Sequence, residues 1–179
     1  SPHIPTGQKD VANKKRQAIL RLSFRNAPAT KVVVFCYTNA ISSPSDSCVV
    51  QISDGRYRLL LSGDIEQEAE RRLLALESKG EGDVFASTSA STRFSTLASA
   101  VLVSPHHGSR TSSTPGFVAA VNPDVVIHSA GDRNQWQFPR PEVVARYQGA
   151  RQWVTGQDGA ILIEAGEAGL EIRPEREQG

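Results

Sequence analysis

The chain has 179 residues, of which 39% are hydrophobic and 22% charged, and this composition is typical of one folded domain with a core of its own. Its 20 basic and 19 acidic side chains give a formal net charge of +1, which excludes a broad cationic surface that would hold nucleic acid by phosphate neutralisation alone. The longest apolar runs, residues 31–37 and 98–103, are far shorter than the roughly 20 residues of a membrane-spanning helix.

Both ends of the chain are polar. Residues 1–16 contain two prolines and end in three consecutive basic residues, which predicts a leader or linker with a solvated basic face. Residues 175–179 are mostly charged or polar and are expected to form a tail. We therefore expect one folded domain over residues 17–174.

The first half of this domain has the pattern of β-strands followed by a helix. Residues 18–25 and 31–37 are rich in apolar and β-branched side chains, which predicts two strands. The Asp-Gly pair at 54–55 predicts a hairpin between strands at 48–53 and 56–61.

The segment after the hairpin has helical periodicity. Ile65, Ala69, Leu73 and Leu76 recur at intervals of three or four, with charged residues between them. This spacing predicts an amphipathic helix over residues 65–79, and the glycines that follow are typical of a helix end.

The second half alternates strand and helix patterns. Helices are predicted at 114–121 and 140–148, and strands are predicted at 98–103, 124–128, 152–155, 160–164 and 170–173. Early hairpins followed by alternating helices and strands predict a layered α/β sandwich with a mixed sheet.

The chain has two cysteines, Cys36 and Cys48, whose spacing matches no zinc or redox motif. Both fall in strand-like runs, so we expect buried free thiols, with a disulfide as the alternative. The pattern does not decide the cellular compartment.

Two groups of potential ligands follow apolar strands directly. Asp64 follows Leu-Leu-Leu-Ser-Gly, and His106 and His107 follow Val-Leu-Val-Ser-Pro. Ligand sites gather at the carboxyl ends of strands in sheets covered by helices. Asp64 has two interpretations: a helix cap completed by Gln67, or a carboxylate that bridges two divalent ions.

The adjacent histidines precede a glycine and lie on no periodic apolar face. Histidine is the commonest metal ligand, which favours a ligand or substrate role over an ordinary polar loop. Ser109 and Arg110 offer a hydroxyl and a cation to an oxyanion such as phosphate. Asn134 lies in a polar turn that could face the same site, whereas His128 closes an apolar strand and is predicted to be a hydrogen-bonded structural histidine.

Taken in order, these motifs resemble the metallo-β-lactamase-like domain of the ComEC family. They are Leu-Leu-Ser-Gly-Asp at 60–64, Ser-Pro-His-His-Gly-Ser at 104–109, Asn-Pro-Asp at 122–124, and Thr155 ahead of Asp-Gly-Ala-Ile. The resemblance covers roughly residues 45–164, and a set of motifs in fixed order is more specific than any single one.

The resemblance implies a four-layer αββα fold in a polytopic inner-membrane protein that imports single-stranded DNA during natural transformation. In that family the domain is assigned to degrading the strand that is not imported. By motif, Asp64 corresponds to the metal-bridging aspartate, His107 to a metal ligand, and His106 to a catalytic neighbour that contacts the scissile phosphate. Ser109, Arg110 and Asn134 are expected to contact substrate.

The implied cofactor is a divalent metal, manganese or zinc. The implied partners are DNA and the membrane channel of the same polypeptide, which places the domain on the periplasmic, outward-facing side of the inner membrane.

The chain departs from the family pattern at two places. The signature His-x-His-x-Asp-His is absent from the sequence, and Gln137-Phe138-Pro139 stands where the family often has Gly-His-Pro. We therefore expect the carboxy-terminal part of the domain, with little or no nuclease activity of its own, because catalytic zinc sites usually use three protein ligands. An upstream segment or another chain could supply the remaining ligands; otherwise the fold serves as a non-catalytic DNA-binding or docking module.

Overall fold

The computed structural model describes residues 20–24, 31–37, 47–79 and 96–175. The predicted leader and most of the predicted tail lie outside these residues. Within the described segments, no helix is long and apolar enough to cross a membrane.

Six strands form the main sheet, in the order β2-β3-β4-β5-β6-β7. Their bounds are β2 (Lys31–Tyr37), β3 (Ser47–Ser53), β4 (Arg58–Leu61), β5 (Val101–Val103), β6 (Val125–His128) and β7 (Arg151–Val154). Strands β2, β3 and β4 pair antiparallel, whereas β4 to β7 pair parallel. This arrangement confirms the predicted mixed sheet.

The predicted β3–β4 hairpin is present, although β4 begins two residues later than expected. The Asp54 carboxylate accepts hydrogen bonds from the backbone N–H groups of Arg56 at 2.9 Å and Tyr57 at 2.6 Å. Gly55 has a φ of +93°, which favours glycine. Because the turn uses these backbone groups, the ladder starts only at Arg58.

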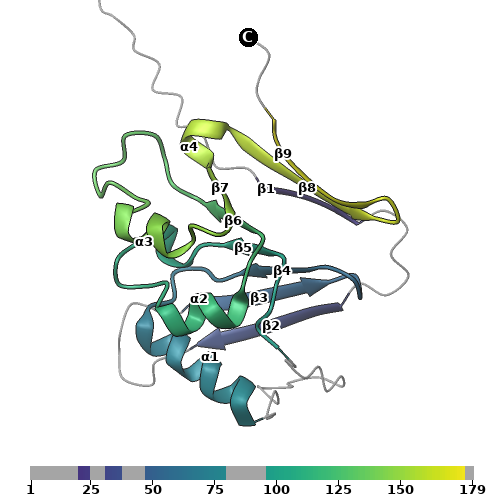
Figure 1. Ribbon diagram of the computed structural model, residues 1–179, viewed down its shortest axis with the longest axis horizontal. Helices are drawn as coiled ribbons and strands as arrows, with labels where there is room; N and C mark the ends of the chain where they lie inside the picture. Colours follow the sequence, from purple (N-terminus) through teal and green to yellow (C-terminus); the bar gives the residue numbers. More distant parts are fainter. Residues whose placement is uncertain (1–19, 25–30, 38–46, 80–95, 176–179) are drawn as a thin grey trace, which may run out of the picture.

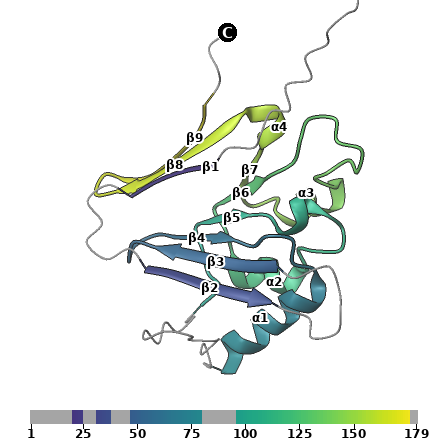
Figure 2. The ribbon, with the colours of Figure 1, turned by 180° about the vertical axis from the view of Figure 1, so that it is seen from behind.

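A second sheet of three strands packs against one face of the main sheet. It contains β1 (Leu20–Phe24), β8 (Ala160–Gly166) and β9 (Gly169–Glu175) in the order β1-β8-β9. Leu59, Val101 and Ile127 of the main sheet contact Ile161 and Ile163 of β8 in a buried cluster between the sheets. Figures 1 and 2 show the small sheet on one side of the main sheet from two opposite views.

Helices cover the opposite face of the main sheet (Figure 1). They are α1 (Gln67–Lys79), α2 (Pro115–Val121) and α3 (Pro141–Arg146), and their buried residues share a core with the sheet. A single turn, α4 (Thr155–Asp158), joins β7 to β8. The described residues therefore form three layers, helices, six-stranded sheet and three-stranded sheet, which confirms the predicted α/β class.

The prediction of buried free thiols was wrong. Cys48 is disulfide-bonded and exposed, and Cys36, the other cysteine of the chain, is its direct neighbour in the β2–β3 register. Residues directly opposite in an antiparallel pair have Cα atoms about 4.5–5.5 Å apart, which is within the range of a disulfide. Strand register, rather than spacing in the sequence, brings the cysteines together.

We expect reduction of this disulfide to lower the free energy of unfolding by about 3 kcal/mol, because the cross-link closes the loop between β2 and β3 in the unfolded chain. Urea unfolding of the oxidised and reduced chain measures the difference. The Cys48→Ser variant is the control, since reductant should not change its midpoint. Equal midpoints for the oxidised and reduced chain would contradict a stabilising cross-link.

His128 is the structural histidine that the sequence predicts. It is fully buried; its Nδ1 accepts from the Ser104 hydroxyl at 2.9 Å, and its Nε2–H donates to Gln152 Oε1 at 3.0 Å. The amide nitrogen of Gln152 donates to the carbonyls of Val144 and Tyr147, which fixes that amide's orientation. Burial lowers the pKa of His128, because the charged imidazolium would lose its hydration.

This lowered pKa predicts that stability falls as pH falls below about 6.5. Below that pH the histidine is protonated in the unfolded chain but stays neutral in the folded chain, so acid favours unfolding. The His128→Gln variant lacks this titration. We expect the stability advantage of wild type over the variant to shrink between about pH 7 and pH 5.5, measured by urea unfolding at each pH. If the difference in stability between wild type and the variant does not change with pH, the lowered pKa of His128 is contradicted.

Candidate functional site

The register of β4 and β5 brings the predicted site residues to one edge of the sheet. The two strands are parallel, with Leu61 opposite Val103, so their carboxyl ends lie side by side. Asp64 follows the first strand, and the turn η1 (Pro105–Gly108), which contains both predicted histidines, follows the second. The backbone N–H of His106 donates to the Gly63 carbonyl at 2.9 Å and joins the two ends.

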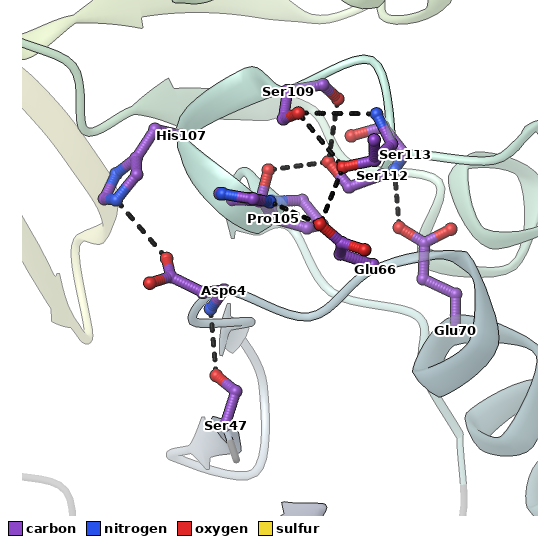
Figure 3. A network of polar contacts seen from close by, with 11 residues as sticks. Ser47, Asp64, Glu66, Glu70, Pro105, His107, Ser109, Ser112 and Ser113 are labelled. Carbon is purple, nitrogen blue, oxygen red and sulfur yellow. Dashed lines mark hydrogen bonds and ion pairs between the residues drawn. The ribbon is translucent and has the colours of Figure 1, made fainter. Parts of the chain in front are cut away.

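Gly63 determines where Asp64 can lie. Its φ is +57°, and a Cβ at this position would lie 2.5 Å from Ser47 Oγ and 3.0 Å from the Cys48 carbonyl oxygen. The same Ser47 hydroxyl accepts from the backbone N–H of Asp64 at 2.9 Å (Figure 3). Any side chain at position 63 would therefore adopt a strained backbone conformation and push the Ser47 hydroxyl away from the N–H of Asp64.

The cap interpretation of Asp64 does not hold, because α1 begins at Gln67, three residues later. Its carboxylate instead points at His107 (Figure 3), and Asp64 Oδ1 lies 3.3 Å from His107 Nε2. The side chains of Asp64 and His107 are 61% and 45% exposed. As a solvent-exposed ion pair they would contribute only about 0–1 kcal/mol to stability, so the arrangement is poorly explained as a stabilising contact.

The tautomer of neutral His107 follows from its second contact. Its Nδ1 lies 2.7 Å from the carbonyl oxygen of Ser129, and a carbonyl can only accept, so Nδ1 carries the hydrogen. The Nε2 lone pair of the neutral ring then faces the carboxylate of Asp64. Two electron-rich atoms at this distance require a shared proton or cation between them. Metal-bound histidines commonly have this arrangement, in which the distal ring nitrogen donates to a backbone carbonyl.

Both histidines occupy the left-handed backbone region. The φ angle is 47° at His106 and 57° at His107. This region is uncommon for residues other than glycine, and such strain is concentrated at functional sites. The strained turn is what aims the two imidazoles from consecutive positions.

His106 lies beside the Asp64–His107 pair. Its Nδ1 is 3.1 Å from Glu66 Oε1, but without the alignment of a hydrogen bond, and this buried atom has no hydrogen-bond partner among the residues described. Glu66 Oε1 accepts from the Thr111 hydroxyl at 3.0 Å. The ring of His106 packs edge-on against Phe138, with centroids 5.9 Å apart. The Nδ1 atom of His106 is therefore turned toward Glu66, while the residue as a whole lines the cavity described next.

A cavity of about 600 Å³ opens next to the histidines. Its lining consists of His106, His107, Ser129, Ala130, Gly131, Asn134, Trp136 and Phe138. Asn134, which the sequence predicts as a substrate contact, lines the cavity, but its amide is engaged within the loop. Its Nδ2 donates to the carbonyls of Gly131 at 2.9 Å and Phe138 at 2.7 Å, and its Oδ1 accepts from the Phe138 N–H at 2.8 Å.

Ser109 and Arg110 lie outside the lining of this cavity. Ser109 is 5% exposed, and its hydroxyl is 3.0 Å from that of Thr111. The guanidinium of Arg110 is 3.4 Å from the carboxylate of Glu142. The structure therefore brings together four of the six predicted residues, Asp64, His106, His107 and Asn134, and places the other two next to them in sequence but facing elsewhere.

The serine-rich loop after the histidines is held by a buried carboxylate. Glu70 of α1 is fully buried and accepts from the backbone N–H group of Ser113 (Figure 3) and from that of Thr114. Burial raises the pKa of Glu70, an effect only partly opposed by these hydrogen bonds and by Arg146. The hydroxyl of Ser112 lies 2.9 Å from the carbonyl oxygen of Pro105 and 2.9 Å from that of Ser109, and it donates to both. The loop supports the turn rather than presenting hydroxyls to a ligand.

The residues present fit half of a metal site. Asp64 offers a carboxylate and His107 an imidazole lone pair, but no group of three or more His, Cys, Asp or Glu side chains suited to a metal occurs in the described part of the chain. Catalytic zinc sites usually have three protein ligands. These two side chains could hold a hydrated divalent ion weakly.

Two residues of this region, Glu66 and Trp136, are not among the sequence predictions. The helical periodicity assigns Glu66 to the polar face of a helix, and a tryptophan in a polar loop is the signal that could have indicated Trp136. Phe138 enters the predictions only as the residue at the family's Gly-His-Pro position. Their proximity to the histidines depends on tertiary contacts that local sequence does not show.

No family model matches the chain. Over 134 residues, 74% of its length, it is 34% identical to an uncharacterized protein of Escherichia coli named YcaI and 32% identical to Recombination protein 2 of Haemophilus influenzae. It is 30% identical over 135 residues, again 74% of the chain, to Competence protein ComA of Neisseria gonorrhoeae. These matches cover only 16%, 15% and 17% of the respective relatives. The chain is thus similar to a small part of much longer proteins, two of which are named for recombination or competence.

Proposed function

We propose that this chain is the carboxy-terminal part of a metallo-β-lactamase-type domain in a DNA-uptake protein of natural transformation. In this proposal Asp64 and His107 contribute to a divalent-metal site for hydrolysis of phosphodiester bonds in the strand that is not imported. The names of two relatives support the link to competence and recombination. The ordered motifs around both residues support the assignment of the site.

The observation that carries the proposal is the orientation of His107. Its Nδ1–H is bound by the Ser129 carbonyl, which leaves Nε2 directed at Asp64 Oδ1 at 3.3 Å. A carboxylate and a correctly oriented imidazole at adjacent strand ends are donors that zinc and manganese accept. A plain surface ion pair would not require two consecutive left-handed residues.

The layers of the fold support the same proposal. A helical layer, a six-stranded sheet and a three-stranded sheet occur in that order. They correspond to three layers of an αββα sandwich. The pair lies at the carboxyl edge of the larger sheet, where ligands of such folds gather.

The chemistry of the site divides between the ion and the chain. A bound divalent ion would supply Lewis acidity and a water of lowered pKa. Asp64 and His107 would hold it, and the Ser129 carbonyl would keep the His107 ring in the required tautomer. His106, which lines the cavity beside the pair, would contact the scissile phosphate.

The disulfide supports an extracytoplasmic location. Disulfides persist in oxidising compartments such as the periplasm and are rare in the cytosol. Cys48 is both exposed and disulfide-bonded, so a reducing compartment would tend to open this bond. We therefore propose the periplasmic, outward-facing side of the membrane for this domain, next to the channel part of the same polypeptide.

One observation favours a second function, that of a non-catalytic DNA-binding or docking module. Phe138 lines the cavity where the resembled family often has a histidine, and a phenyl ring has no nitrogen, oxygen or sulfur atom with which to ligate zinc. In this alternative the fold and the cavity remain while hydrolysis is lost.

Calorimetric titration of the metal-stripped chain with manganese and with zinc tests the metal site. We expect saturable binding that is at least about tenfold weaker in Asp64→Asn or His107→Gln, a loss of about 1.4 kcal/mol, and undetectable in the double variant. Asp64→Asn removes the negative charge of the carboxylate, and His107→Gln removes the imidazole nitrogen, while both substitutions keep a polar side chain of similar length.

Two control variants make this result specific. His106→Gln should leave the affinity for metal unchanged, because His106 is placed beside the ion rather than on it, and Asp124→Asn changes an exposed carboxylate away from the pair. Unchanged metal affinity in the double variant would overturn the metal site and favour the non-catalytic module.

A further inference from the structure

We propose that Trp136 is a base-stacking residue, which binds a nucleobase of single-stranded DNA at the cavity beside the Asp64–His107 pair. The inference rests on the proposed function for the class of ligand, and it names a binding residue that the motifs do not include. Trp136, Phe138 and Arg140 carry the argument.

Trp136 is exposed in a way that stability does not explain. It is 57% exposed and stands out as the exposed large hydrophobic residue of the described segments. Its ring stacks on that of Phe138, with centroids 6.3 Å apart and planes 18° from parallel. One face of the indole is thus supported by Phe138, while much of the remaining surface meets water and the cavity. An aromatic shelf of this kind binds bases of any identity, because every base has a flat face.

The shelf is preorganised relative to the histidines. Asn134 binds both the N–H and the carbonyl of Phe138, and the Gln137 N–H donates to the Asn134 carbonyl at 3.0 Å. The Arg140 N–H donates to the Gly108 carbonyl at 2.9 Å, which ties the end of the loop to the histidine turn. A ligand on the shelf would therefore lie at a fixed position from His106, and binding would cost little ordering of the loop.

A cation for the adjoining phosphate lies on the same shelf. The Arg140 guanidinium carbon is 5.9 Å from the Phe138 ring centroid, and its Nη1 donates to Gln137 Oε1 at 3.3 Å. It has no carboxylate partner among the described residues. Arg110 and Arg133 differ, because each is paired with a carboxylate. Arg140 is thus the cation of this loop that can meet a phosphate without first losing an ion pair.

The size and charge of the region favour one nucleotide of a single strand. The cavity of about 600 Å³ falls in the range of about 300–1,000 Å³ that small-ligand sites occupy. In duplex DNA the faces of each base are covered by its neighbours, and exposing one requires unstacking. Asp64 and Glu66 would repel an uncompensated phosphate, so base stacking must provide much of the affinity.

The test measures binding of a fluorescently labelled oligothymidylate by anisotropy, in low salt and with EDTA so that no metal contributes. We expect Trp136→Ala to weaken binding by roughly tenfold, the effect of losing one stacked base, whereas Trp136→Phe retains most of the affinity. Trp153→Phe, which alters the second of the two tryptophans, should leave affinity unchanged. In that background, the fluorescence of Trp136 should be quenched as the oligonucleotide saturates.

Altered oligonucleotides and a substitution at Arg140 test the two parts of the proposed contact, the base and the phosphate. An oligonucleotide with abasic sites and a duplex of the same sequence should both bind more weakly than the single strand. Arg140→Ala should weaken binding and reduce the salt dependence by about one phosphate contact. Equal affinity for abasic and intact strands, no loss in Trp136→Ala, or no binding of single strands at all would each overturn the stacking role.

Failure of this inference is distinguishable from failure of the metal site. The Asp64→Asn/His107→Gln variant should bind the oligonucleotide in EDTA at least as tightly as wild type does, because stacking needs neither residue and the substitution removes a carboxylate that repels phosphate. Metal binding in calorimetry without a Trp136 effect would leave the metal site intact and remove the shelf. Unfolding midpoints of each variant are measured in parallel, and the exposure of Trp136 predicts that its substitutions preserve the fold.

Discussion

Parallel pairing of β4 with β5 is the constraint on which the candidate site depends. It places the residues after two distant strands at one edge, and the Gly63 carbonyl then accepts from the backbone N–H of His106. The left-handed backbone of Gly63 and its close approach to Ser47 disfavour any side chain at that position. The Asp64–His107 pair is therefore a product of sheet register and one glycine, and neither the acid nor the histidine would be positioned by local structure alone.

The strained histidine turn is stabilised by its surroundings rather than by its own conformation. A Cβ on Gly108 would lie 2.6 Å from Pro139 Cβ, so the loop that lines the cavity and ends near Pro139 packs directly on the histidine turn. On the other side the Ser112 hydroxyl donates to the Pro105 carbonyl at 2.9 Å. Two left-handed residues cost of order 1–3 kcal/mol each, and this cost is borne only because both neighbouring loops hold the turn in place.

Local patterns predicted the elements well where one rule dominates. The Asp-Gly turn, the helix beginning at Pro115 and the buried His128 all follow from short-range signals. Asp64 shows where such signals fail: its spacing to Gln67 predicts a cap, but the helix begins at Gln67, whose N–H donates to the Thr111 carbonyl at 3.1 Å. The sequence did not predict the bonded state of Cys48 or the stacking of Trp136 on Phe138 for the same reason. The disulfide depends on strand register, and the stacking depends on the packing of a loop, and neither is visible in local sequence.

The proposed metal binding and the proposed nucleic-acid binding at this edge would depend on different residues, but each would affect the other. Stacking on Trp136 is largely independent of charge, whereas a phosphate beside it would approach the carboxylates of Asp64 and Glu66. A cation held by Asp64 and His107 would remove part of that repulsion, and by linkage a bound strand would strengthen metal binding by the same factor. With only two protein donors in the described residues, phosphate oxygens would themselves be natural further ligands for a hard divalent ion. The aromatic ring of Phe138 is compatible with this proposed arrangement, because it would support the stacked base while phosphate oxygens of the strand would supply the metal ligands that the ring cannot.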